Sequence, residues 1–259
     1  MIGGAVTLTE LGVILILVAV AIALSRYRSV DLERDLMLAV VRSFVQLSAL
    51  GYVIQAIFDS ESIWLVCLLL AAMVAFGTFT AGRRAASVPG QYPIILFALS
   101  LAAALTLGLI VVLGVFPPTP RYLIPVGGIV IGNSMTAIAV SLDRLGDEVH
   151  RATGELEATL ALGATWRQAS TGLVARSLRS AMIPLIDQTK TTGLVTLPGA
   201  MVGMLVAGAE PLEAVRLQLI LLWSLLGSVA MAAVIATSLG SRGFFTPAHQ
   251  LRDLERPAE

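Results

Sequence analysis

Apolar runs long enough to cross a bilayer recur along this chain, and they constrain its fold more than any other feature. A helix that crosses about 30 Å of hydrocarbon needs roughly 20 mostly apolar residues. Because 57% of the 259 residues are hydrophobic and only 13% are charged, the sequence predicts an all-α integral membrane protein with seven transmembrane helices. The predicted spans are 7–25, 36–58, 62–80, 94–116, 122–142, 182–207 and 215–239.

Basic residues lie unevenly on the two sides of these spans. Cytoplasmic loops of membrane proteins carry an excess of Lys and Arg. The arginines gather on 26–34, 83–84, 144–179 and 242–256, whereas the alternate connections contain only Arg121 and Arg216. This asymmetry predicts an N-terminus outside the cell and a C-terminus in the cytosol. No positively charged segment precedes the first run, so we expect it to remain as a helix.

The connection between the fifth and sixth spans, residues 143–180, is the only large one. Leucine and valine recur in its first half at helical spacing, with charged residues on the other face. We expect an amphipathic helix that continues the fifth span, ends near Gly163 and is followed by a second helical stretch through Trp166. Residues 1–259 are therefore predicted to form a single transmembrane domain, with 143–180 as its cytosolic helical part.

Signatures of covalent chemistry are absent from the sequence. It has no G-x-x-x-x-G-K-[ST] phosphate loop, and its two histidines, His150 and His249, stand far apart. Without a nucleophile elbow or convergent spacing, ordinary surface histidines are the better interpretation. Lys and Arg together number 17, as do Asp and Glu, so no basic field exists to hold nucleic acid. We expect neither an enzyme nor a cofactor in this chain.

Polar side chains inside the predicted spans mark a candidate translocation path, since such groups are costly in a membrane. Arg42 and Asp187 lie near the cytosolic boundary, where snorkelling or a mutual ion pair would satisfy them without a transport role. Pro198 interrupts the sixth span and would free backbone groups to line a cavity. Methionines at helical spacing more often fill a core than bind metal, so no metal ligand is assigned. The candidate path comprises Arg42, Gln46, Asn133, Ser134, Thr136, Asp187, Lys190, Thr192, Thr196, Met201 and Met204.

The segment ELEATLALGAT, residues 155–165, contains an acidic residue, small residues and a glycine at a specific spacing: Glu157, Ala158, Thr159 and Gly163. This spacing resembles the coupling motif of ABC-transporter permeases. A short helix with small residues on one side can lie in a groove of a neighbouring subunit, and a glycine permits the turn away from it. A solvated amphipathic helix is an equally good interpretation of these residues alone.

Longer segments are similar to one family, the Fet-type ABC-transporter permeases. The similar segments are RSFVQLSALGYVIQ (42–55), IPVGGIVIGNSMTAIAVSLDRL (124–145), ELEATLALGATWRQA (155–169) and TTGLVTLPGAMVGMLVAGAEPLEA (191–214). Bacterial members of this family are regarded as iron exporters, and plant relatives are linked to aluminium tolerance. Two positions depart from the expected pattern. The next proline after Gly163 is Pro184, further on than the general permease motif expects, and Met204 stands where we expect a Gln in relatives.

The resemblance implies the membrane subunit of an ABC exporter, a multi-pass protein of the bacterial inner membrane surrounded by lipid. It also implies two copies of this chain, separate ATPase subunits that bind ATP and Mg and dock on 143–180, and a metal, iron, as cargo. The pairs Gly128/Gly132 and Gly199/Gly203 suit close approach of two copies, or packing within one chain.

Two other classes compete with this interpretation. A seven-span protein whose only lysine is Lys190, with Asp187 nearby, invites a retinal-type pump. A retinal pocket needs aromatic walls, however, and only 6% of the residues are aromatic. An ion-coupled secondary carrier would transport without an ATPase, but the sequence shows no clear inverted repeat.

Overall fold

A computed structural model describes residues 8–28 and 31–252, and this part of the chain contains nine α-helices. The chain divides into two compact units, Met1–Ser60 and Glu61–Glu259, which are described separately. The predicted all-α class is confirmed. Five helices of the described part are long and apolar enough to cross a membrane, and a sixth apolar stretch, Gly12–Tyr27, is shorter. The protein is a multi-pass membrane protein.

The N-terminal unit is a pair of helices, α1 (Leu8–Tyr27) and α2 (Glu33–Ser60). The turn between them is closed by Ser25, whose hydroxyl oxygen accepts a hydrogen bond from the Leu32 backbone N–H at 3.1 Å. Almost all described side chains of both helices are exposed within the chain. Long apolar helices with uncovered side chains match a lipid environment, where helices gain little from burying apolar surface against each other.

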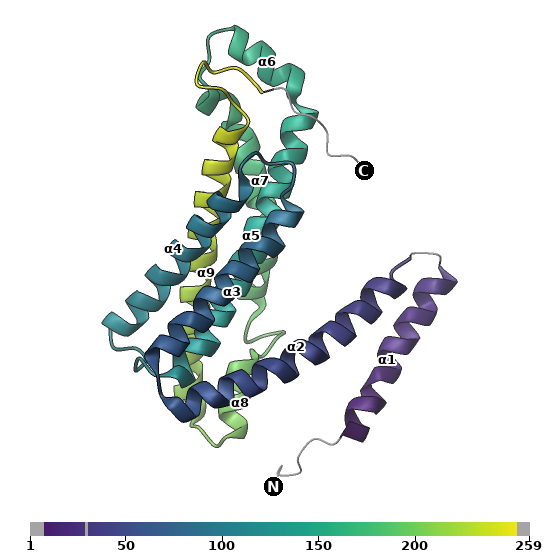
Figure 1. The fold of residues 1–259 in the computed structure, drawn as a ribbon, viewed down its shortest axis with the longest axis vertical. Coiled ribbons are helices and arrows are strands. Elements are labelled where there is room, and N and C mark those ends of the chain that lie inside the picture. Colours follow the sequence, from purple (N-terminus) through teal and green to yellow (C-terminus); the bar gives the residue numbers. More distant parts are fainter. Residues whose placement is uncertain (1–7, 29–30, 253–259) are drawn as a thin grey trace. The chain divides into compact units, whose positions relative to one another are not determined.

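The C-terminal unit is a helix bundle with α5 at its centre. Helix α5 contacts α3, α4, α7 and α9, and α6 and α8 lie at opposite ends of this unit (Figure 1). The bounds are α3 Ile63–Arg84, α4 Gln91–Val112, α5 Pro120–Arg151, α6 Thr153–Ala161, α7 Trp166–Thr191, α8 Gly199–Val206 and α9 Pro211–Gly243.

Small residues allow the helices of this bundle to approach closely. A Cβ built on Gly240 of α9 would lie 2.7 Å from the Leu142 side chain of α5, so a larger residue would force that side chain to move. Leu142 and Ala236 are fully buried in the same core cluster. Because lipid tails are as apolar as leucine, this close packing, rather than exclusion of water, stabilises the bundle.

In the predicted cytosolic connection, the end of α5 and the whole of α6 precede the turn at Gly163. Helix α5 runs without interruption from the fifth span to Arg151, as expected, but it ends there and α6 follows. The prediction of one continuous helix up to Gly163 was therefore wrong, because the helix is interrupted at Ala152. The Thr153 hydroxyl donates to the carbonyls of Val149 and His150, and such side-chain bonds compete with the regular helix ladder. The second helical stretch is confirmed as α7.

The sixth predicted span is not one helix. Helix α7 ends at Thr191, residues 192–198 form an irregular segment, and α8 begins at Gly199. The interruption predicted at Pro198 therefore starts earlier. Gly193 adopts φ +89°, a conformation that ends helices, and its N–H donates to the Thr196 carbonyl at 2.8 Å.

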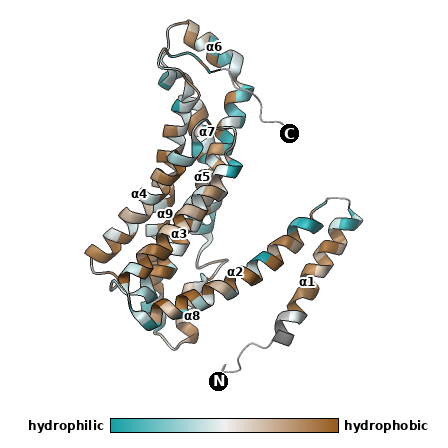
Figure 2. Ribbon diagram, in the orientation of Figure 1, coloured by the Kyte–Doolittle hydropathy of each residue, from teal (hydrophilic) through white to brown (hydrophobic). Residues whose placement is uncertain are grey.

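Hydrophilic residues are concentrated at the α6 end of the C-terminal unit, and brown apolar ribbon covers most of α3 and α4 (Figure 2).

After α9 the chain folds back as a short hairpin, residues 244–252, which we call the C-terminal hairpin. Its two sides meet at a bridge between Phe245 and Leu251. Phe244 and Phe245 are buried and belong to the same core cluster as Leu156 of α6 and Leu173 of α7. One apolar core therefore extends from the bundle into the predicted cytosolic region.

Candidate functional site

A cavity of about 310 Å³ lies where the irregular segment 192–198 meets the bundle. Its walls come from α5, the end of α7, the irregular segment, the start of α8 and α9. Non-helical backbone at membrane depth is tolerated where it is buried in protein or lines a wet cavity. The break in the sixth span is therefore associated with a chamber. Its polar wall residues are Asn133, Gln188, Thr192, Thr196 and Gln218.

Hydrogen bonds orient several of these side chains. The Asn133 amide nitrogen donates to the Ile129 carbonyl at 2.8 Å, which leaves its carbonyl oxygen as an acceptor. The Thr192 hydroxyl donates to the Gln188 carbonyl at 2.7 Å. The side-chain oxygen of Gln218 is buried and has no hydrogen-bond partner within the described part of the chain. Buried polar groups normally make at least one hydrogen bond, so this oxygen is a candidate acceptor for water or cargo.

The cavity offers neutral oxygens rather than charged or sulfur ligands. Among residues 8–28 and 31–252, no group of three or more His, Cys, Asp or Glu gathers in a way that could hold a metal ion. Amide and hydroxyl oxygens suit hard cations, whereas thiolates and thioethers suit soft ones. Neutral ligands bind weakly, and weak binding suits an ion that must leave again.

Asn133, Thr192 and Thr196 are the candidate path residues that line this cavity. Thr136 donates to the Gly132 carbonyl at 3.0 Å and is exposed. Ser134 is completely buried inside the bundle. Met201 and Met204 do not line the cavity and lie half-buried on α8. Arg42 and Gln46 lie exposed on α2, which belongs to the separately described N-terminal unit.

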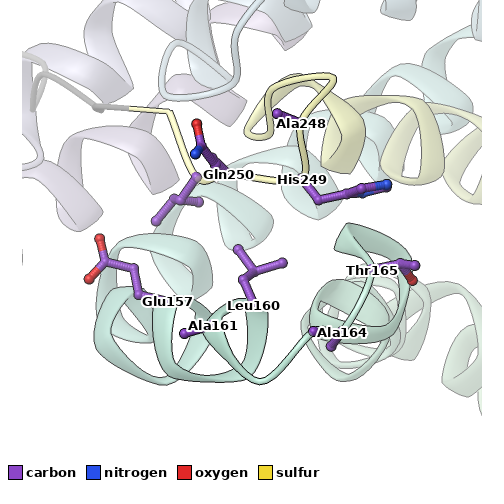
Figure 3. A pocket seen from close by; sticks show the side chains of 10 residues that line it. Glu157, Leu160, Ala161, Ala164, Thr165, Ala248, His249 and Gln250 are labelled. Atoms are coloured by element: carbon purple, nitrogen blue, oxygen red, sulfur yellow. The ribbon is translucent and has the colours of Figure 1, made fainter.

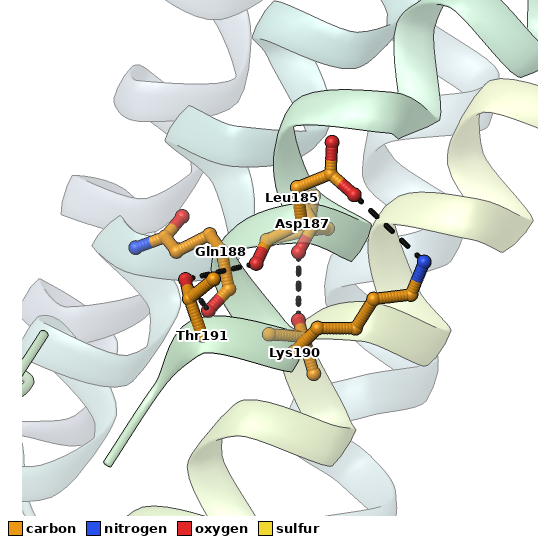
Figure 4. Close-up of polar contacts among 6 residues, drawn as sticks. Leu185, Asp187, Gln188, Lys190 and Thr191 are labelled. Carbon is orange, nitrogen blue, oxygen red and sulfur yellow. Dashed lines mark hydrogen bonds and ion pairs between the residues drawn. The ribbon is translucent and has the colours of Figure 1, made fainter. Parts of the chain in front are cut away.

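Asp187 and Lys190 form an ion pair with each other at the end of α7. The Lys190 nitrogen lies 3.8 Å from an Asp187 oxygen, and the two side chains are 71% and 63% exposed (Figure 4). Asp187 thus has Lys190 as an ion-pair partner within the C-terminal unit. An exposed, paired lysine lacks the enclosed setting that a retinal Schiff base needs, so this geometry does not favour the retinal-type pump.

Sequence reasoning missed Gln218 and did not include Gln188 in the path. Gln218 is a single amide in the apolar stretch RLQLILLW, residues 216–223. That isolated polarity was the available signal, because amides are rare within membrane spans. Only the fold shows that this position on α9 faces the irregular segment.

The predicted coupling residues lie at the α6 end of the C-terminal unit, beside a groove of about 560 Å³. Glu157 and Gly163 line the groove on one side, and His249 of the C-terminal hairpin lines it on the other (Figure 3). Ala158 is exposed, and the Thr159 hydroxyl donates to the Glu155 carbonyl at 2.7 Å. The groove therefore contains two of the four predicted residues, and all four lie on one helix and its turn.

The turn after α6 has a defined shape. Gly163 adopts φ +88°, and Thr165 starts α7 with a capping box that it forms with Gln168. Leu162, between the two helices, is 90% exposed. Sequence reasoning did not single out this exposed apolar side chain.

Helix α7 connects the coupling turn to the cavity without a break. It has 26 residues, which corresponds to about 39 Å of helix. Its first turn follows Thr165 in the groove wall, and its last residues precede Thr192 in the cavity wall. An ion pair of 2.8 Å between Arg176 and Glu148 also ties α7 to α5. Pro184 lies within α7, and the helix continues past it to Thr191.

Comparison with known proteins identifies the family. The model of the family described as "Uncharacterised protein family (UPF0014)" matches residues 8–245. The chain belongs to this family. The resemblance to Fet-type permeases is thereby confirmed, since "Probable iron export permease protein FetB" of Escherichia coli (strain K12) is 33% identical over 246 residues, which cover 95% of each chain.

Plant relatives of the family are more similar still. "UPF0014 membrane protein STAR2" of Oryza sativa subsp. japonica is 43% identical over 236 residues, covering 91% of this chain and 83% of the rice protein. "Protein ALUMINUM SENSITIVE 3" of Arabidopsis thaliana is 41% identical over 241 residues, covering 92% of this chain and 87% of its own length. No solved structure matches the chain.

Proposed function

We propose that this UPF0014 chain is the membrane-spanning permease subunit of an ABC transporter that exports a metal ion. Two copies form the path across the bacterial inner membrane. Separate ATPase subunits bind ATP and Mg, dock on residues 143–180 and drive alternating access. The observation that carries the proposal is the continuity of α7 between the groove at Gly163 and the cavity at Thr192.

Iron is the proposed cargo. The name of the Escherichia coli relative states iron export for that protein, and the cavity of this chain supplies oxygens from Asn133, Gln188 and Gln218 that suit a hard cation. A path with neutral oxygens holds such a cation weakly enough to release it on the other side.

Glycines with uncovered faces support the proposed dimer. Added Cβ atoms on Gly132, Gly199 and Gly203 would meet no described atom within 4 Å, whereas one on Gly128 would lie 3.2 Å from Met73. Gly128 therefore serves packing within the chain. The other three leave space for close approach of a second copy.

Charge reversal on α6 tests the coupling role. Glu157→Arg should weaken co-purification with the cognate ATPase subunit and abolish iron-stimulated ATP hydrolysis in nanodiscs, because Glu157 lines the groove. Glu155→Arg is the matched control, since Glu155 is exposed on the same helix but does not line the groove. Both proteins should remain monodisperse. Wild-type binding and hydrolysis by Glu157→Arg would show that α6 is only a solvated helix.

A further inference from the structure

A second depression, which we call the basic cleft, lies at the C-terminal end of α9, just beyond the predicted span 215–239. It has a volume of about 710 Å³ and is bounded by the start of α7, the end of α9 and the C-terminal hairpin. Three arginines, Arg167, Arg242 and Arg252, line it together with His249, and no carboxylate of residues 8–28 or 31–252 does. We propose that this cleft binds the phosphate headgroup of an anionic phospholipid.

The arginines of the cleft are available for an anion. Within the described part of the chain, the ion pairs are Arg176–Glu148 and Lys190–Asp187, so none of the three has a carboxylate partner there. Arg167 lies over the Trp166 ring at 5.4 Å, and the Nε of Arg252 donates to the Phe245 carbonyl at 3.3 Å. These contacts orient the two guanidinium groups and leave their terminal N–H groups for a ligand. Guanidinium groups bind phosphate through paired, charge-assisted hydrogen bonds.

The backbone beside the arginines adds to the positive potential. The cleft includes the N-terminus of the long helix α7, where the positive end of the helix dipole favours an anion. Nδ1 of His249 accepts the Trp166 N–H at 3.4 Å, which places the ring proton of a neutral imidazole on Nε2, as a further donor. His249 holds φ +59°, a conformation that costs a non-glycine residue energy and is often found at binding sites.

The surroundings favour a lipid over a soluble phosphate. Leu239 lines the cleft, is 40% exposed, and lies one turn before Arg242 on the membrane-spanning helix α9. Residues three apart lie on the same helix face, so an apolar side chain adjoins the basic ones toward the bilayer. Trp166, whose ring lies 6.2 Å from that of the buried Phe245, is also of a residue type enriched at membrane interfaces. Basic pockets at helix ends that face the membrane surface recognise anionic headgroups in this way.

Lipid retention tests the proposal directly. The protein is reconstituted in nanodiscs of phosphatidylcholine with or without phosphatidylglycerol, and the rise in Tm and the lipid retained in native mass spectra are measured. Phosphatidylglycerol should raise the Tm of the wild type and remain bound. Arg242→Gln and Arg252→Gln should each bind it about fivefold more weakly or worse. Arg83→Gln, which alters the corresponding last turn of α3, should behave like the wild type.

Three outcomes would overturn the proposal. The first is equal retention of phosphatidylglycerol by the wild type and both cleft variants, and the second is an equal loss in Arg83→Gln. The third is a full Tm increase from inorganic phosphate alone in phosphatidylcholine, which would make the ligand a soluble anion. If the cleft variants do not fold, a salt titration on the wild type decides, since retention that does not fall with ionic strength contradicts headgroup binding by arginines. The nanodiscs contain no ATPase subunit, so the result is independent of the proposed transport function, although Thr165 and His249 line both the cleft and the groove.

Discussion

Replacement of Gly163 tests whether the backbone conformation of the turn after α6 matters for ATPase binding, because an alanine adds no polar or charged group. Gly163 holds φ +88°, and an added Cβ would meet no described atom within 4 Å. Gly163→Ala therefore introduces no clash, and its only cost is that of holding an L-residue in a left-handed conformation, about 1–2 kcal/mol. If the ATPase binds only the native turn, the free energy of binding becomes less favourable by that amount. The affinity then falls by a factor of about 5 to 30.

Two matched variants provide comparisons for the loss of affinity expected in Gly163→Ala. Gly163→Asn should bind better than Gly163→Ala, because asparagine adopts left-handed conformations more readily. Gly154→Ala lies in α6, where φ is not positive and an added Cβ also meets nothing within 4 Å. It should raise helix stability by about 0.5–1 kcal/mol and leave binding intact.

The assay is titration of the permease in nanodiscs with its cognate ATPase subunit, alongside iron-stimulated hydrolysis. The order wild type, Gly163→Asn and Gly163→Ala, with Gly154→Ala equal to wild type, is the expected result. Native affinity in Gly163→Ala would refute the idea that the partner recognises this turn. A similar loss in Gly154→Ala would show that the conformation of Gly163 is not the cause.

Two further predictions concern the cavity and the topology. Gln218→Leu should keep or raise the Tm, because it removes a buried acceptor without a partner, and should reduce iron efflux from proteoliposomes; unchanged efflux would exclude Gln218 from the path. In a Cys67→Ser background, Ala248→Cys should react with an impermeant maleimide only after the cells are permeabilised, whereas Pro118→Cys should react in intact cells. The reverse pattern would contradict the orientation with the C-terminus in the cytosol.

Local sequence signals predicted the elements that depend on neighbouring residues. Apolar length located the five long helices α2, α3, α4, α5 and α9, and the glycine after the last helical leucine located the turn at Gly163. The threonines around Thr192 and Thr196 predicted polar side chains within the sixth span. Each of these features follows from composition or backbone preference within a few residues, so no knowledge of the packing was needed.

Features that depend on distant contacts were not predictable in this way. Gln218 lines the cavity only because α9 packs beside the irregular segment. The C-terminal hairpin contacts the start of α7 through His249 and Trp166, which are 83 residues apart. The break at Thr192 also precedes Pro198, since the hydrogen bond from Gly193 to Thr196 closes a turn that propensity alone does not specify.

The size of the cavity bears on how the proposed cargo would travel. A water molecule occupies about 30 Å³ of liquid, so a chamber of about 310 Å³ has room for an ion together with its first shell of water. Neutral amides such as Asn133 and Gln218 can hydrogen-bond to those waters but supply no negative charge to replace them. Removing the water shell from a hard cation would therefore be costly here, whereas moving the cation through with its water shell would not. Movement of α7, which displaces the wall at Thr192, would then suffice to change the side on which the chamber opens, with no need to break strong metal–ligand bonds.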